Sequence, residues 1–256
     1  MAADLELAAR QALACLDLTS LNDADTAADI EALCRRAQTP FGPVAAVCVW
    51  PRFVAQARAL LPETIKVAAV ADFPDGALDL TRAVADVMLI GAAGGDEVDV
   101  VLPYRALMAG QGGEVAEFLS EVRHASRPLT LKVIIESGEL KDPKLIAEAT
   151  RLALMAGADF VKTSTGKSPV SATREAAAVM LQEIKASGLA NAGFKASGGI
   201  RSVADAAAYL QLAADQLGAA ALQPGRFRFG ASGLLNDIEA VLSGGPAAPA
   251  AAAGGY

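Results

Sequence analysis

The sequence predicts an α/β protein, a (β/α)8 TIM barrel with an N-terminal helical extension. Short apolar runs alternate with longer amphipathic stretches, a pattern typical of βαβ units around a parallel sheet. The chain has 256 residues, and barrels of this kind usually take about 250 residues as one domain. We count eight candidate strands, and eight units favour a closed barrel over an open doubly wound sheet.

The candidate strands are rich in valine, isoleucine and alanine, as strands covered on both faces by helices usually are. The clearest are residues 44–49, 65–71, 96–102, 129–135, 158–164 and 193–197. Two weaker ones follow at 218–222 and 226–231. Because these two lie close together, a count of seven strands with an open edge is the alternative.

The helical stretches and the two ends of the chain complete the expected domain organisation. Residues 1–40 are expected to form the helical extension, and residues 1–243 a single barrel domain that includes it. One amphipathic stretch has Asp142 as a candidate N-cap and Gly157 as a stop. The tail at 244–256 is a low-complexity run of alanine, glycine and proline, which we expect to be flexible.

Composition and charge restrict the partners of the chain. Its formal net charge of -7 argues against nucleic acid or an anionic membrane, because both require a basic face. No apolar run approaches the roughly 18 residues that a membrane span needs. The N-terminus lacks the features of a signal peptide, and three cysteines without metal-ligand or redox spacing indicate reduced thiols. We therefore expect a cytoplasmic protein; its oligomeric state stays open, with a homodimer as a candidate.

A single histidine limits the chemistry that the chain can perform. His124 lies in a polar stretch and is expected to be a solvated helix residue. One histidine excludes a multi-histidine zinc site and disfavours a histidine-based triad. We expect no metal and no other cofactor, so the reaction must depend on lysine, acidic, hydroxyl or thiol side chains.

Ionisable residues interrupt or end several candidate core strands. These are Asp99, Lys132, Lys162 and Lys195. Such residues are almost never fully buried unless they are paired. Side chains alternate along barrel strands, and active sites lie at the carboxyl ends of the strands, so these groups can converge on one pocket. The alternative is a buried ion pair, such as Asp99 with Lys132, that holds the barrel together.

Two neighbouring lysines in such a pocket favour Schiff-base chemistry. A free lysine with a pKa near about 10.4 is almost entirely protonated at neutral pH, and only the neutral amine attacks a carbonyl. Burial and a second ammonium group both lower the pKa of a lysine. One lysine can therefore be the nucleophile and the other the charge that depresses its pKa. Asp99 could then move protons directly or through water.

Three glycine-bearing loops after late strands predict a phosphate site. They are STGKS at 164–168, SGGIRS at 197–202 and GASG at 230–233. Glycine lets backbone amides approach a phosphate, and the start of a helix adds a favourable dipole. A nucleotide P-loop is disfavoured, because its first glycine would have to stand at Val161. Several such loops at late strands are typical of phosphate binding in this fold.

Five long motifs in this order resemble the deoxyribose-phosphate aldolase family of class I aldolases. They are EVDVVLPYRALMAG (97–110), LKVIIESGELKD (131–142), GADFVKTSTGK (157–167), GFKASGGIRS (193–202) and RFGAS (228–232). The resemblance runs from about residue 15 to 238. It implies a (β/α)8 barrel that reversibly cleaves 2-deoxy-D-ribose 5-phosphate into acetaldehyde and D-glyceraldehyde 3-phosphate.

The resemblance also implies roles for individual residues. Lys162 corresponds to the Schiff-base lysine, Lys195 to the lysine that lowers its pKa, and Asp99 to the proton-relay carboxylate. Residues that would orient water or substrate hydroxyls are Asp17, Thr19, Lys132 and Thr165. The phosphate would lie against Gly166, Lys167, Gly198, Gly199, Ile200, Arg201, Gly230, Ser232 and Gly233.

Two departures from the family and two outer residues qualify this expectation. Gly233 stands where relatives often have serine, so a phosphate-binding hydroxyl is missing although the backbone amide is kept. Ala196 replaces a frequent proline after Lys195. Cys48, at the end of the first candidate strand and near the pocket in the family, is interpreted as a small buried hydrophobe. Tyr256 is either part of a frayed terminus or a phenol that closes over the barrel and assists proton transfer.

Other functions are compatible with parts of the pattern. Another Schiff-base aldolase could use a different phosphosugar or a ketoacid. A catalytically silent phosphosugar-binding protein would keep the glycine loops but need neither Lys162 nor Lys195. A metal-dependent aldolase is disfavoured by the single histidine.

Overall fold

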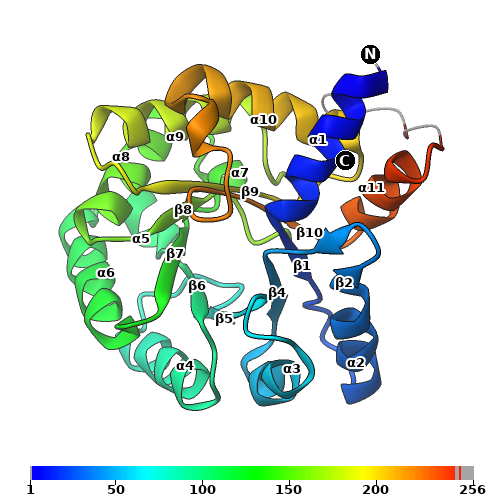
Figure 1. The fold of residues 1–256 in the computed structure, drawn as a ribbon. Coiled ribbons are helices and arrows are strands. Elements are labelled where there is room, and N and C mark those ends of the chain that lie inside the picture. The colour runs from blue at the N-terminus through cyan, green and yellow to red at the C-terminus, as the bar shows by residue number, and fades with distance from the viewer. Residues whose placement is uncertain (1, 246–247, 249–256) are drawn as a thin grey trace.

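Eight parallel strands close into a barrel in the computed structural model, which describes residues 2–245 and 248 (Figure 1). Around the barrel each strand pairs with its neighbour in the chain, and the last pairs with the first. The strands are β1 (Leu16–Thr19), β4 (Ala46–Val49), β5 (Lys66–Ala71), β6 (Glu97–Val101), β7 (Thr130–Ile134), β8 (Phe160–Lys162), β9 (Gly193–Ser197) and β10 (Phe227–Ala231). The predicted TIM barrel is confirmed.

Helices surround the barrel and cover the outward faces of its strands (Figure 1). They are α1 (Ala2–Ala14), α2 (Ala27–Arg36), α3 (Val54–Leu60), α4 (Leu80–Ala92), α5 (Tyr104–Met108), α6 (Gly112–Ser126), α7 (Ser137–Leu140), α8 (Pro143–Met155), α9 (Arg174–Ala186), α10 (Val203–Leu217) and α11 (Leu234–Leu242). The short elements are the hairpin of β2 (Gln38–Thr39) and β3 (Gly42–Pro43) and the 3-10 helices η1 (Pro51–Phe53) and η2 (Ala219–Ala221).

The helix boundaries follow from capping chemistry. The carboxylate of Asp142 accepts a hydrogen bond from the backbone N–H of Lys144 at the start of α8, as predicted. Gly157 follows the end of α8 with a φ of 86°, which the absence of a Cβ permits. Ser202 and Asp205 form a capping box that begins α10 directly after the loop of residues 197–202.

The hydrophobic core lies between the strands and the helices. Every residue of β4, β6, β9 and β10 is buried, including the ionisable residues that those strands carry. The outward-facing aromatic side chains of Phe194, Phe227 and Phe229 pack against one another. Each contributes roughly 1.5–3 kcal/mol through burial. This shell holds the strands in register and so positions the side chains that point into the barrel.

Two predicted features of the strand list are wrong. Residues 218–222 contain the 3-10 helix η2, and Gly218, with a φ of 84°, is the C-cap that follows the end of α10 at Leu217. The segment GAAAL has no β-branched or aromatic residue, and such residues are the ones enriched in strands. The missing strand is β1, within residues 1–40, which were expected to be helical. It is four residues long and directs Asp17 and Thr19 into the barrel, so no apolar run marks it.

This exchange affects the closure of the barrel and the place of Cys48. β1 pairs with both β4 and β10, so the alternative with seven strands and an open edge is wrong. Cys48 lies in β4, the second barrel strand of the chain rather than the first. His124 is an exposed residue of α6, as predicted. Across the described part of the chain, no helix combines the length and apolar character needed to cross a membrane.

Candidate active site

Strand register brings the ionisable core residues to one face of the sheet, the inside of the barrel. Hydrogen-bonded neighbours in a parallel sheet point to the same side, and side chains alternate along each strand. The register pairs are Asp99 with Lys132, Lys162 with Lys195, and Lys195 with Arg228. The charged side chains of five neighbouring strands, β6 to β10, therefore share the barrel interior.

Lys162 is the last residue of β8 and reaches the centre of this cluster. Its side chain is 2% exposed, and its Nζ donates to Asp99 Oδ2 at 2.8 Å. Burial lowers the pKa of Lys162. The negative charge of Asp99 raises this pKa and the positive charge of Lys195 lowers it further, and together these effects leave the pKa of Lys162 below its usual range. More of this amine is therefore neutral at neutral pH than for a lysine in water.

Lys195 lies in the register position next to Lys162 and has the opposite electrostatic balance. Its Nζ contacts Asp17 Oδ2 at 2.5 Å and Asp99 Oδ2 at 2.7 Å. Burial alone would lower the pKa of Lys195, but Asp17 and Asp99 raise it above its usual range. Lys195 is thus a buried ammonium group that shares one carboxylate oxygen with Lys162. The pKa values of the two lysines thus shift in opposite directions, as a nucleophile and a neighbouring charge require, and the roles themselves stay predictions.

Asp99 is the hub that connects the three lysines. Its Oδ1 accepts from Lys132 at 2.7 Å, and its Oδ2 accepts from Lys162 and Lys195. Burial would raise the pKa of Asp99, but the three lysines together hold it well below its usual range. Asp99 is therefore an ionised carboxylate that can accept protons from either amine.

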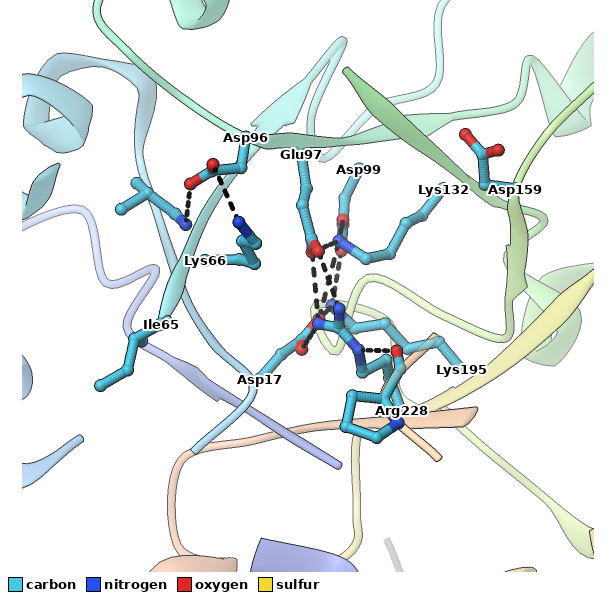
Figure 2. A network of polar contacts seen from close by, with 12 residues as sticks. Asp17, Ile65, Lys66, Asp96, Glu97, Asp99, Lys132, Asp159, Lys195 and Arg228 are labelled. Carbon is cyan, nitrogen blue, oxygen red and sulfur yellow. Dashed lines mark hydrogen bonds and ion pairs between the residues drawn. The ribbon is translucent and has the colours of Figure 1, made fainter. Parts of the chain in front are cut away.

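A second layer of charges extends from the hub toward the amino ends of the strands (Figure 2). Lys132 also contacts Glu97 at 2.5 Å. Arg228 contacts Asp17 Oδ1 at 2.5 Å and Glu97 Oε1 at 2.8 Å. Burial would raise the pKa of Asp17, but the neighbouring cations, Arg228 first, hold it below its usual range. The suggested ion pair of Asp99 with Lys132 therefore exists alongside the cluster around Lys162.

Two of the predicted pocket residues, Thr19 and Cys48, have more limited contacts. Thr19 Oγ1 donates to the backbone carbonyl of Asp17 at 2.9 Å, and its side chain is partly exposed. Cys48 lies in register with Thr19, and its thiol is fully buried. Burial and the charge of Asp99 raise the pKa of Cys48. A neutral, enclosed thiol agrees with its interpretation as a small hydrophobe.

A buried carboxylate that the sequence analysis left without a role holds the loop after β8. Glu136 Oε2 accepts from Thr165 Oγ1 at 2.5 Å, and its Oε1 accepts from Ser168 Oγ at 2.9 Å. Thr165 Oγ1 in turn accepts from the backbone N–H of Lys167 at 3.0 Å. Glu136 itself adopts a left-handed backbone conformation, with a φ of 52°. Thr165 therefore shapes the loop from within.

The three glycine loops meet at the carboxyl ends of β8, β9 and β10. A Cβ added to Gly198 would lie 3.3 Å from Gly166 Cα. The backbone N–H of Gly198 donates to the Gly230 carbonyl at 3.3 Å. A Cβ on Gly230 would approach Ser197 Oγ to 2.5 Å. Gly166 and Gly198 both have positive φ values, 80° and 87°. Only residues without a side chain fit this junction.

The remaining predicted phosphate residues lie around this junction with different exposure. Gly199 and Gly233 face open space, where an added Cβ would meet nothing within 4 Å. Ile200 is buried, whereas Arg201 and Ser232 are exposed. Lys167 Nζ donates to the backbone carbonyl of Leu21 at 2.7 Å, so it connects the loop after β8 to the loop after β1. Tyr256 and most of the tail at 244–256 lie outside the described residues.

Glu97 and Arg228 are interior charges to which the sequence analysis assigned no role. Glu97 begins the motif EVDVVLPYRALMAG and Arg228 begins the motif RFGAS, and the spacing of each within its motif could have identified it. Glu97 lies two residues before Asp99 and Arg228 two before Gly230, so each shares the face of a predicted site residue. Because side chains alternate along a strand, counting back two residues from Asp99 and from Gly230 would have placed both charges inside the barrel.

Comparisons with known proteins agree with the fold and show what the chain is similar to. The family model described as DeoC/LacD family aldolase matches residues 11–240. A deoxyribose-phosphate aldolase of Agrobacterium fabrum is 50% identical over 252 residues, which are 97% of this chain and 96% of the relative. A crystal structure from Coccidioides immitis, proposed to be a deoxyribose-phosphate aldolase, is 29% identical with a TM-score of 0.79, and the match covers 90% of this chain and 87% of that one. One from Toxoplasma gondii has a TM-score of 0.87 at 24% identity, covers 95% and 97%, and supports the fold alone.

Proposed function

The chain belongs to the DeoC/LacD family of aldolases, and we propose that it cleaves 2-deoxy-D-ribose 5-phosphate through a Schiff base on Lys162. The products are acetaldehyde and D-glyceraldehyde 3-phosphate, and the reaction is reversible. The observation that carries the proposal is the buried amine of Lys162, which shares an oxygen of Asp99 with the ammonium group of Lys195. A class I aldolase needs such a neutral amine together with a nearby proton donor.

In the proposed reaction the amine of Lys162 first attacks the aldehyde carbon of the open-chain sugar. The carbinolamine that forms loses its hydroxyl group as water, for which a proton is required, and a protonated imine results. The Lys195 ammonium group is placed to supply that proton, because it donates to the same carboxylate oxygen as Lys162. Asp99 can receive the proton that leaves the attacking amine and return it to Lys195 or to water.

Carbon–carbon cleavage then uses the imine as an electron sink. A base removes the proton of the C3 hydroxyl, the C2–C3 bond breaks, and its electron pair forms the enamine on Lys162. Glyceraldehyde 3-phosphate leaves with a new aldehyde group. Protonation of the enamine carbon gives the imine of acetaldehyde, and water hydrolyses this imine to release acetaldehyde and the free amine. No metal or other cofactor is required in this sequence.

We assign the phosphate to the junction of the three glycine loops. Gly199 and Gly233 leave open space there, because an added Cβ would meet nothing within 4 Å, and α10 and α11 begin at the same end of the barrel. The start of a helix attracts anions, because its first N–H groups have no partner within the helix. The ammonium group of Lys167 donates to the Leu21 carbonyl and would have to leave it to reach a phosphate oxygen. Thr165 and Glu136 would act by holding the loop.

Borohydride reduction in the presence of acetaldehyde, followed by peptide mapping, tests the Schiff base. We expect a two-carbon adduct on the peptide with Lys162 and none after Lys162→Arg. Lys144→Arg is a matched control, because Lys144 lies at the exposed start of α8. An adduct on Lys195 would reverse the roles of the two lysines. Absence of any adduct would refute Schiff-base catalysis.

Substrate acceptance distinguishes the proposed activity from its alternatives. A Schiff-base aldolase for a ketoacid would not use acetaldehyde as donor, and a silent binding protein would bind the phosphosugar without turnover. We expect condensation of acetaldehyde with glyceraldehyde 3-phosphate and much slower condensation with unphosphorylated glyceraldehyde. The ratio of the two kcat/KM values measures the contribution of the phosphate site.

Three further expectations stay predictions. The phenol of Tyr256 is proposed to assist protonation of the enamine carbon. Deletion of this last residue should then slow both turnover and exchange of the acetaldehyde methyl protons with solvent, and an unchanged exchange rate would contradict the assignment. Cytoplasmic localisation and assembly as a homodimer are the other two.

A further inference from the structure

The charges inside the barrel balance only when Lys162 is neutral. Three interior carboxylates, Asp17, Glu97 and Asp99, belong to a single network of ion pairs, because each cation of the network other than Lys162 contacts at least two of them. Among the described residues, the cations of that network other than Lys162 are Lys132, Lys195 and Arg228. Three negative charges therefore face three positive charges, and a protonated Lys162 would add an unbalanced positive charge in a region shielded from water.

The far end of this network is the salt bridge between Arg228 and Glu97. Both side chains are at most 6% exposed. They border a cavity of about 690 Å3 that is lined by residues preceding or beginning the strands, such as Thr64, Thr130 and Pro224. This is the end of the barrel opposite the glycine loops. Neither residue is therefore placed to touch the substrate.

Arg228 is held rigidly at that end. Its Nε donates to the Pro224 carbonyl at 2.5 Å, and its guanidinium carbon lies 5.6 Å from the centre of the Phe160 ring. Its two Nη atoms bind Asp17 and Glu97. Asp17 then binds Lys195, and Lys195 binds the Asp99 oxygen that also contacts Lys162. A continuous chain of ion pairs thus connects Arg228 to the proposed nucleophile.

We propose that Arg228 and Glu97 are positioning residues that set the pH range in which Lys162 is a nucleophile. They act through the net charge of the barrel interior, and the inference rests on the proposed function of Lys162. Removal of the Glu97 charge leaves a positive excess, which disfavours protonation of Lys162. Removal of the Arg228 charge leaves a negative excess, which favours it. The two changes must therefore shift the titration of Lys162 in opposite directions.

The other titratable groups that face the network cannot supply the balance. The thiols of Cys15 and Cys48 are buried, and burial raises the pKa of both, that of Cys15 to about 12. Both thiols are therefore uncharged near neutral pH. The opposing cations hold the pKa of Asp17 and Asp99 below the usual range, so these carboxylates stay ionised. Lys162 is therefore the group of the network whose protonation can change with the total charge of the other groups.

The test compares Glu97→Gln, Arg228→Met and the double variant by the pH dependence of two measurements. The first is kcat/KM for deoxyribose 5-phosphate cleavage, whose acidic limb reports groups of the free enzyme. The second is the rate of acetylation of Lys162 by acetic anhydride, read by peptide mapping, which needs no turnover. We expect the midpoint to fall by about one pH unit in Glu97→Gln and to rise by about one in Arg228→Met. A unit charge roughly 10 Å away in a medium of effective dielectric about 20 has that effect.

Three comparisons separate the charge effect from structural damage. The double variant restores neutrality and should return the midpoint to near that of the parent protein. Arg228→Lys keeps the charge and should leave the midpoint in place even if activity falls. Arg226→Met is the matched control, because Arg226 lies just before β10 and donates to Ala192 outside the network. Circular dichroism checks that each variant folds.

Shifts in the same direction, or no shift in either single variant, would overturn the inference. A shift in Arg226→Met equal to that in Arg228→Met would also overturn it, because the effect would then come from the net charge of the whole protein. If the parent protein forms no reducible adduct on Lys162, the proposed function fails. The acetylation midpoints still test the charge balance in that case, since they do not depend on the aldol reaction.

Discussion

Replacement of Lys195 by leucine removes the ammonium group nearest to the amine of Lys162. The two Nζ atoms contact the same oxygen of Asp99 at 2.7 and 2.8 Å, so they lie within roughly 5 Å of each other. At an effective dielectric of about 20, a unit charge at roughly 5 Å contributes about 3 kcal/mol, or about two pH units. We therefore expect the pKa of Lys162 to rise by about two units in Lys195→Leu.

The sign of the effect determines the assay. A higher pKa leaves less neutral amine at pH 7, so imine formation should fall about 100-fold there and recover as the pH rises through the new pKa. The measurement is the acidic limb of the kcat/KM profile together with the rate of adduct trapping. Lys195→Arg keeps a positive charge and should preserve the midpoint while impairing proton transfer.

An unshifted acidic limb in Lys195→Leu would refute this explanation. Lys195 would then act as a proton donor and not as the charge that depresses the pKa of Lys162. Stability must be followed in parallel, because the variant leaves Asp17 and Asp99 with fewer buried partners. Loss of one partner of a buried pair typically costs about 3–5 kcal/mol, so thermal unfolding provides the necessary control.

Three other substitutions test separate parts of the structure. Burial raises the pKa of Asp72 to about 7, and the charge of Arg82 opposes this shift only in part. Ionisation of Asp72 therefore destabilises the fold as the pH rises from about 4 to 7. Asp72→Asn should raise the free energy of unfolding, measured by urea titration, by about 2 kcal/mol at pH 8 and change it little at pH 4. Gly138→Ala would place a Cβ 1.9 Å from the Val170 carbonyl oxygen, so we expect the loop after β8 to move. KM for the phosphorylated substrate should then rise about tenfold, and KM for unphosphorylated deoxyribose should rise less. Equal effects on both substrates would contradict a role for this loop in phosphate binding. Gly233→Ser adds a hydroxyl at a φ of -88° in open space, and a charge-assisted hydrogen bond to phosphate should lower KM about fivefold; an unchanged KM would show that the hydroxyl does not reach the phosphate.

The sequence alone identified the family, the barrel and the three central site residues as candidates. Strands that are buried on both faces produce apolar runs, and a lysine within such a run is conspicuous because burial of an unpaired charge is so costly. The family assignment from the five motifs is confirmed. The same logic failed for β1, since a four-residue strand that carries Asp17 and Thr19 inside the barrel has no apolar run.

Only the tertiary structure decided which charges are partners and how they balance. Arg228 contacts Glu97 across 131 residues of sequence and Asp17 across 211. Such pairs depend on strand register and barrel closure, which are set by packing of the whole shell and not by local spacing. Lys132 stood out in the sequence as readily as Lys162 did, and only its three carboxylate neighbours distinguish it as a permanent ammonium group. Local sequence determines where a lysine lies on a strand, whereas its protonation depends on the sum of the charges around it.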